Sequence, residues 1–141
     1  MPQLGKFAIS ALAVVVSAAA AQAQTYLCIA DIGTGFSYSK ASRTWETTRF
    51  DVKDKRYLVK KTEKGWIWSN FGEPSEHLCE GNSLNGFIGC DGDGRMGIKF
   101  FVDRLSMRYQ KSYLYGYLHN PATTDTEADT PLIEIGRCSV M

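Results

Sequence analysis

The sequence predicts a small all-β domain, folded as a single antiparallel meander that forms a closed or partly open barrel. Apolar and polar side chains alternate over residues 94–118, and this period of two is typical of strands. Runs rich in β-branched and aromatic residues recur between short polar turns, as in antiparallel neighbours. No helix-length window repeats its apolar residues every 3.6 positions. A β-sandwich is the alternative architecture, because it also consists of many short strands.

The first 23 residues predict a cleaved secretory signal peptide. Lys6 supplies a positive charge, and an uncharged apolar run of 15 residues follows at 7–21. This run is shorter than the roughly 20 residues that a membrane span needs. The Ala-Gln-Ala triplet at 21–23 then offers a cleavage site of the A-x-A type. We therefore expect a mature chain that begins at Gln24, has no membrane span, and is periplasmic or secreted.

The mature chain, residues 24–141, has the size and charge of one ordinary domain. Its 118 residues are enough to bury roughly two-thirds of the unfolded surface. Removal of the signal leaves fifteen basic and fifteen acidic residues, so the net charge is zero. This balance argues against a general nucleic-acid or anionic-membrane binder. We expect a single domain with no nucleic-acid partner.

Nine short strands are expected, and turn residues bound each of them. They are Tyr26–Ala30, Phe36–Ser39, Thr44–Val52, Arg56–Thr62, Trp66–Asn70, Asn85–Cys90, Leu132–Cys138 and the two arms of a hairpin over 94–118. Residues 72–77, with Pro74 near their start, are expected to hold one helical turn. Brief polar turns favour sequential antiparallel pairing. Because sequential hairpins need no long crossover, we prefer the barrel to the sandwich.

The hairpin over 94–118 carries the longest alternation in the chain. The polar run Val102–Leu105 is its expected turn. The second arm is expected to continue as a strand to Leu118. One face of the first arm holds Met96, Ile98, Phe100 and Val102, and one face of the second arm holds Met107, Tyr109, Tyr113, Tyr115 and Tyr117.

All four cysteines, Cys28, Cys79, Cys90 and Cys138, lie in the mature chain. An even number of cysteines in an exported chain predicts disulfides. Four cysteines allow three connectivities, and we favour Cys79–Cys90, which closes a short loop rich in glycine and asparagine. Cys28–Cys138 then joins the first and last strands and is expected to seal the seam of the barrel. A metal site is not expected, because the spacing contains neither C-x-x-C nor a histidine between Cys79 and Cys90.

Basic residues are concentrated in one part of the mature chain. Residues 40–64 hold nine basic and four acidic side chains, whereas residues 73–93 hold five acids and no lysine or arginine. Solvated strand faces explain this segregation, since lysines on edge strands discourage aggregation. The functional alternative is a patch for an anionic partner, such as a glycan or a lipopolysaccharide phosphate. Its candidate residues are Arg49, Lys53, Lys55, Arg56, Lys60 and Lys61.

Aromatic residues are the most suggestive feature for ligand binding. Trp66 and Trp68 share a strand face because they are two positions apart. Core packing explains such residues, since a small barrel is filled by its own side chains. A tyrosine-rich interior can also hold a small apolar ligand or a sugar at the barrel mouth. The candidate ligand-binding residues are Trp45, Trp66, Trp68, Tyr113, Tyr115 and Tyr117.

No motif in the sequence supports catalysis. The segment 92–97 matches G-x-G-x-x-G, but a dinucleotide site needs a helix after it, and a strand is expected there. As a calcium loop the segment fails, because Arg95 and Val102 occupy positions that need oxygen ligands. His77 and His119 have no partner spaced for metal binding or for activating a nucleophile. No catalytic residue, metal or cofactor is expected.

Residues 26–31, 56–59 and 136–139, together with the tyrosine-rich arm, resemble small exported, cysteine-stapled β proteins of Gram-negative bacteria. The resemblance implies a compact secreted β domain and carries over no functional residue. We expect non-enzymatic binding of a small ligand, a glycan or an envelope component. One alternative is a protein inhibitor of an envelope-targeting hydrolase, whose loop between Cys79 and Cys90 enters the enzyme's cleft. The other is a small hydrolase that uses one of the two histidines.

Overall fold

The computed structural model describes residues 24–79, 84–91, 97–118 and 130–141, so the predicted signal peptide lies outside the described residues. Two 3-10 helices, η1 (Leu84–Gly86) and η2 (Tyr115–Leu118), accompany the strands. The strands are β1 (Thr25–Ser39), β2 (Thr44–Phe50), β3 (Arg56–Thr62), β4 (Gly65–Asn70), β5 (His77–Leu78), β6 (Phe87–Asp91), β7 (Ile98–Asp103), β8 (Arg108–Tyr113) and β9 (Leu132–Val140).

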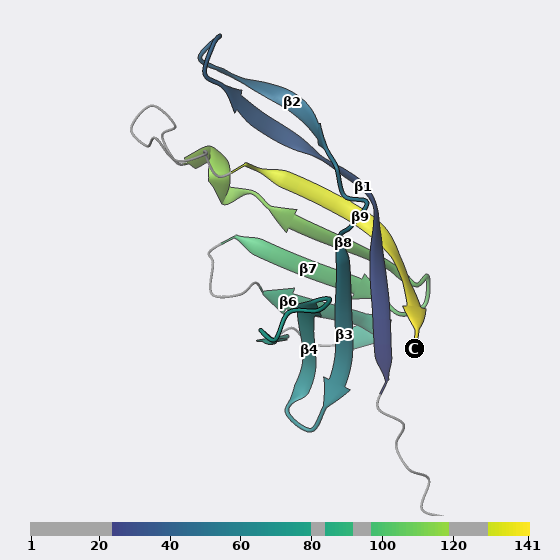
Figure 1. Cartoon of the computed structure of the whole chain (residues 1–141). Coiled ribbons are helices and arrows are strands. Elements are labelled where there is room, and N and C mark those ends of the chain that lie inside the picture. The colour runs from purple at the N-terminus through teal and green to yellow at the C-terminus, as the bar shows by residue number, and fades with distance from the viewer. Residues whose placement is uncertain (1–23, 80–83, 92–96, 119–129) are drawn as a thin grey trace, which may run out of the picture.

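The strands form one antiparallel sheet in the order β5-β4-β3-β1-β9-β8-β7-β6, with β2 paired to β1 outside this path. The sheet curls into a nearly closed barrel of eight strands (Figure 1). The first and last strands, β1 and β9, lie side by side, as a closing meander requires. The predicted all-β barrel is therefore confirmed, and the sandwich does not form.

β1 is one strand of 15 residues where two shorter strands were expected. Its register against β9 shifts between Ala30 and Ile32, and such a bulge bends a strand without ending it. One edge of β1 pairs with β3 before the bulge and with β2 after it. Gly35 permits this path, since a Cβ there would lie 2.0 Å from the Pro131 carbonyl oxygen. Beyond the barrel, β1 and β2 continue as a two-stranded arm (Figure 1).

Both predicted disulfides, Cys28–Cys138 and Cys79–Cys90, are present. The expected position of the seam is wrong, because Cys28 and Cys138 are direct partners in the β1–β9 ladder. This bridge therefore joins strands that backbone hydrogen bonds already hold together. The unsealed seam lies between β6 and the β4–β5 edge, which share no ladder among the described residues. Cys79 follows β5 and Cys90 lies in β6, so the second bridge crosses the seam.

The predicted hairpin forms from β7 and β8, and its turn is displaced toward the C-terminus, to residues 104–107. Asp103 fixes the turn, because its carboxylate accepts hydrogen bonds from Leu105 N (2.9 Å) and Ser106 Oγ (2.7 Å). β8 ends at Tyr113, and the next two tyrosines lie in η2. The predicted strand to Leu118 is therefore wrong.

The helical turn predicted for residues 72–77 is also wrong. The chain turns there without a helix and then forms the short strand β5, which pairs with Ile67 and Trp68 of β4. Cys79 N continues this contact by donating to the Trp66 carbonyl oxygen (2.8 Å). The short polar segment therefore follows the sheet edge, because pairing satisfies backbone groups that one isolated helical turn leaves open.

Inward-facing side chains fill the barrel interior. Trp68 stacks on Phe100 with ring centroids 5.0 Å apart, and Tyr57 meets Phe100 edge to face at 5.3 Å. Such aromatic pairs add to the stabilisation from buried area. Every barrel strand except the short β5 contributes to this core. The core residues are Tyr26, Cys28, Ala30, Tyr57, Val59, Trp66, Trp68, Cys79, Ile88, Cys90, Phe100, Val102, Tyr109 and Cys138.

Candidate functional site

Two of the predicted ligand-binding aromatics, Trp66 and Trp68, belong to the packed interior, with exposed fractions of 6% and 2%. Trp66 stacks on Tyr26 with ring centroids 5.8 Å apart. Trp68 lies between Phe100 and His77, whose ring centroid is 5.2 Å from that of Trp68. Both tryptophans are therefore packing residues, and neither lines one of the two surface grooves described below.

A polar group, here called the Glu134 cluster, is also buried in the interior. Glu134 is 3% exposed, and its carboxylate accepts hydrogen bonds from the hydroxyls of Tyr109 (2.7 Å) and Tyr57 (3.1 Å). Lys111 Nζ donates to the Tyr57 hydroxyl oxygen (3.2 Å). Burial and the neighbouring carboxylate raise the pKa of both phenols well above the ordinary value. The cluster therefore links β3, β8 and β9 through satisfied polar contacts, as a structural network does.

The remaining aromatic candidates lie near the arm and at the end of β8. The Trp45 ring centroid is 5.6 Å from that of Tyr38 and 5.5 Å from that of Tyr117 in η2. Tyr115 packs against Gly97, where a Cβ would lie 2.0 Å from its ring. Tyr113 ends β8 and is paired with Leu132 of β9. The structure therefore brings Trp45 and Tyr117 together but does not gather the six predicted residues into one site.

The predicted basic patch is divided between elements. Arg49 lies in β2, Lys53 and Lys55 lie in the turn before β3, and Arg56 begins β3. Lys53 pairs with Asp51 at 3.3 Å between exposed side chains, a contact of little energetic weight. The other two candidates follow in β3, where consecutive residues face opposite sides of a strand. The six cations therefore do not present one common face.

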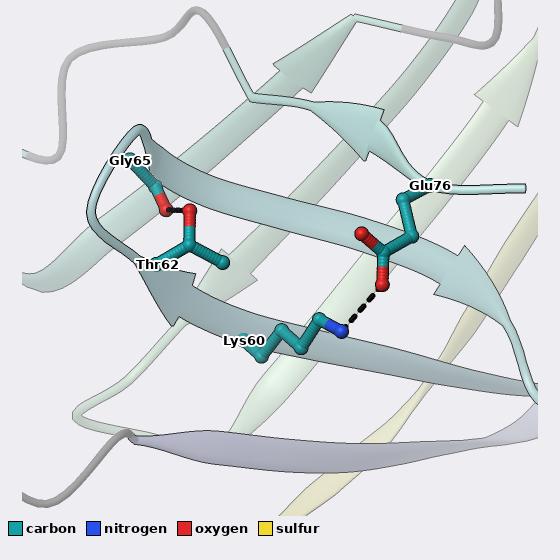
Figure 2. Close-up of polar contacts among 4 residues, drawn as sticks. All are labelled: Lys60, Thr62, Gly65 and Glu76. Atoms are coloured by element: carbon teal, nitrogen blue, oxygen red, sulfur yellow. Dashed lines mark hydrogen bonds and ion pairs between the residues drawn. The ribbon is translucent and has the colours of Figure 1, made fainter.

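The last two basic candidates have their own partners. Lys60 of β3 forms an ion pair with Glu76, which directly precedes β5, as Figure 2 shows. Lys61 Nζ lies 5.5 Å from the centroid of the Trp66 ring. Beside the ion pair, a groove of about 490 Å³ lies between the β3–β4 turn and β5, where the Thr62 hydroxyl donates to the Gly65 carbonyl oxygen (2.9 Å; Figure 2). Of the charged side chains in this groove, Glu76 pairs with Lys60, while Glu63 and Lys64 are exposed, so the groove offers few converging polar groups.

The outer face of the barrel carries an unexpected set of exposed apolar side chains. These residues have exposed fractions of 41–51%, and they lie on the solvent side of β1, β6, β7 and β9. Exposed apolar patches of this kind mark binding surfaces more often than isolated apolar residues do. We call the set the outer apolar strip: Ile29, Ile32, Phe36, Phe87, Phe101, Ile133 and Ile135.

A groove of about 680 Å³ runs over β8 on this same face. Backbone register explains its composition: Gln110 of β8 lies between Phe101 of β7 and Ile135 of β9, so a polar floor has apolar walls. Its volume falls within the range of roughly 300–1,000 Å³ of small-molecule sites. We call it the β8 groove. Its lining consists of Asp31, Phe87, Phe101, Asp103, Ser106, Arg108, Tyr109, Gln110, Ile135, Gly136 and Arg137.

Two arginines lie directly opposite each other in the β8 groove, Arg108 on β8 and Arg137 on β9. Arg137 donates from Nε (2.9 Å) and Nη2 (3.1 Å) to the Asp31 carboxylate, and this contact lowers the pKa of Asp31. Arg108 lies opposite Asp103 of β7, whose carboxylate is engaged by the β7–β8 turn. Within the described part of the chain, Arg108 forms no ion pair. The groove therefore contains one cation without a contacting anion.

The described residues offer no support for metal chemistry. They contain no group of three histidine, cysteine, aspartate or glutamate side chains placed to hold a metal. His77 packs on Trp68, while His119, residues 92–96 and residues 80–83 of the loop between Cys79 and Cys90 lie outside the described residues. In the described ranges, no helix has the length and apolarity needed to cross a membrane. The two disulfides indicate an extracytoplasmic protein, because such bonds persist in oxidising compartments.

Comparison with protein-family models, with curated proteins and with solved structures finds no match to this chain. The candidate site must therefore be judged on geometry alone. Sequence reasoning missed the outer apolar strip, although one signal was present. Phe100 and Phe101 are adjacent, as are Leu132 and Ile133, and adjacent apolar residues in a strand must face opposite sides. Phe100 is accordingly buried in the core and Phe101 is 45% exposed.

Proposed function

We propose that this protein is an exported, non-enzymatic binding domain, periplasmic or secreted, that holds an envelope component on the outer face of its barrel. The observation that carries the proposal is the β8 groove, where apolar walls meet a polar floor. Sites for ligands are concave and mostly apolar, with a few placed polar groups. The outer apolar strip extends this surface from β6 to the arm.

The filled interior supports an outer site rather than an inner one. Tyr57 and Phe100, in the middle of the barrel, are 1% and 0% exposed. Displacing such residues for a ligand would cost the free energy of their burial, about 1.5–3 kcal/mol for a large apolar side chain. The β8 groove needs no such rearrangement, because its apolar walls already face solvent.

The test is binding of the purified mature chain to envelope fractions, namely membrane vesicles and peptidoglycan sedimented separately. We expect co-sedimentation with one fraction, and we expect the double substitution Phe101→Ser with Ile135→Ser to weaken it strongly. Phe71→Ser is the matched control, since Phe71 is 50% exposed but lies outside the groove. Equal loss of binding in the control, or none in the double variant, would show that the β8 groove is not the site.

A further inference from the structure

We propose that the β8 groove binds an anionic amphiphile, a molecule with one acyl chain and a phosphate head group, and that the head group lies beside Arg108. The inference rests on the proposed function and adds the chemistry of the ligand. It follows from the charges of the groove, from the arrangement of its walls, and from its concave shape.

The two arginines of the groove face two aspartates, Asp31 and Asp103, but within the described part of the chain only Arg137 contacts a carboxylate. Arg108 and Arg137 are direct cross-strand partners, and like charges in this position destabilise a sheet. Asp31 compensates Arg137 through two hydrogen bonds. Asp103 is the cross-strand partner of Arg108 on β7, but its oxygens accept hydrogen bonds from Leu105 N and Ser106 Oγ, so no described carboxylate contacts Arg108. A phosphate placed beside Arg108 would relieve the repulsion and form charge-assisted hydrogen bonds.

The neighbouring side chains define where an acyl chain would lie. Phe101 and Ile135 flank Gln110 on either side of β8. Phe87 of β6 pairs with Asp103, two positions along β7 from Phe101, and also lines the groove. Phe87 is 51% exposed, so burying its ring against an acyl chain would remove apolar surface from water. Gln110 lies two positions from Arg108 along β8 and also lines the groove, and a side-chain amide can donate to the same head group.

The shape of the surface favours a small amphiphile over a protein. Protein–protein interfaces of standard size cover roughly 800 Å² on each partner and are generally broad. The β8 groove is a hollow of about 680 Å³ over one strand, and its lining includes the Asp31–Arg137 ion pair. A single chain with one charged end matches this hollow, which has apolar walls on both sides and one arginine, Arg108, without a contacting carboxylate among the described residues.

The experiment is titration calorimetry of the mature chain with dodecyl phosphate, dodecyl maltoside and inorganic phosphate, each below any micelle-forming concentration. We expect dodecyl phosphate to bind most tightly, because only it presents both parts of the ligand. Arg108→Gln should weaken its binding about tenfold, the effect of one lost charge-assisted contact. Phe101→Ala should weaken the binding of both dodecyl compounds.

Two control variants match these substitutions. Arg49→Gln removes an exposed arginine on β2, and Phe71→Ala removes an exposed phenylalanine outside the groove. Both should change the affinity for dodecyl phosphate less than about twofold, which corresponds to ~0.4 kcal/mol. If Arg108→Gln does not fold, Arg108→Lys keeps the charge and should keep most of the affinity, and added salt should weaken wild-type binding.

The outcomes separate this inference from the proposed function. Equal binding of dodecyl maltoside and dodecyl phosphate, with Arg108→Gln silent, would overturn the head-group assignment while leaving a groove that binds apolar chains. Failure of all amphiphiles, with envelope fractions still bound through Phe101, would overturn the inference but not the proposed function. Tighter binding of a peptide with one glutamate between leucines would assign the groove to a protein partner and overturn the inference.

Discussion

The barrel is held together differently at its two critical boundaries. At the β1–β9 junction, a ladder runs from Tyr26 to Gly35, and Cys28–Cys138 adds a covalent bond between direct partners. At the seam between β5 and β6, the described residues share no ladder, and Cys79–Cys90 supplies the covalent link. A disulfide therefore reinforces the backbone ladder at the β1–β9 junction, whereas at the seam a disulfide takes the place of a ladder.

This difference separates two kinds of stability. Cys28–Cys138 spans a sequence separation of 110 residues and Cys79–Cys90 one of 11. In the chain-entropy model, the longer loop restricts the unfolded chain more. The junction bridge should therefore contribute mainly to the global free energy of unfolding. The seam bridge should contribute less to that quantity but should control local opening of the folded barrel.

The largest effect is expected from removing the junction bridge. Cys28→Ser with Cys138→Ser should lower the free energy of unfolding by about 5 kcal/mol, the chain-entropy value for so long a loop. The folded structure should persist, because the β1–β9 ladder remains. Urea denaturation measures the loss, and circular dichroism at low urea checks the fold. A change in the native spectrum without added denaturant would contradict the view that this bridge only reinforces the junction.

The Glu134 cluster also stabilises the barrel near the β1–β9 junction, since it links β9 to β8 and β3. Glu134→Ala should lower the free energy of unfolding by ~4 kcal/mol, because two buried phenols lose their acceptor at ~1–3 kcal/mol each. Urea denaturation again provides the measurement. Glu46→Ala is the control, as Glu46 is exposed and accepts a hydrogen bond from Ser42 (2.9 Å). Equal losses in the two variants would mean that the buried hydrogen bonds to Glu134 add no more to the free energy of unfolding than an exposed hydrogen bond does.

Removing the seam bridge should cost less but open the barrel locally. Cys79→Ser with Cys90→Ser should lower the free energy of unfolding by about 3 kcal/mol. The Trp68 indole N–H reports on local opening, since Nε1 is buried without a hydrogen-bond partner in the described residues. Its hydrogen exchange should accelerate far more than the global loss explains. In the variant without Cys28–Cys138, exchange at Trp68 should accelerate only as much as the lower global stability requires. Local opening at Trp68 in that variant, but not in the variant without Cys79–Cys90, would contradict the assigned roles of the two bridges.

Much of the fold could be predicted from the sequence, because local patterns determine it. The alternation in β7, the span Arg56–Thr62 of β3 and both disulfides were predicted correctly. The seam could not be predicted, because it depends on which strand edges find partners across the barrel. The end of β8 could not be predicted either, because the alternation of tyrosines continues past Tyr113. The ladder between β8 and β9 ends at the pair Tyr113 and Leu132, and the chain after Tyr113 forms η2.

The candidate site was less predictable than the fold. The aromatic residues were explained either by core packing or by a ligand site at the barrel mouth, and Trp66 and Trp68 pack in the core. The β8 groove arises from register, which places Arg108 beside Arg137 although these residues are far apart in sequence. No local pattern encodes such a pairing. Register between distant strands follows from the whole set of buried side chains, and this is why the β8 groove emerged only from the structure.

The smallest effect is expected from a single phenol of the Glu134 cluster over one unit of alkaline pH, and it also concerns the junction side. Burial and the Glu134 carboxylate raise the pKa of Tyr57 and Tyr109 in the folded protein above that of an unfolded tyrosine, which is about 10. The stability that these hydroxyls provide is therefore complete below about pH 10 and decreases above it, by ~1.4 kcal/mol per pH unit for each phenol. Urea denaturation at alkaline pH measures this slope.

Tyr109→Phe should reduce the slope by one phenol's share, whereas Tyr117→Phe, which leaves the Glu134 cluster intact, should retain it. The same slope in Tyr109→Phe and the wild type would show that the buried hydrogen bond to Glu134 does not resist alkaline unfolding.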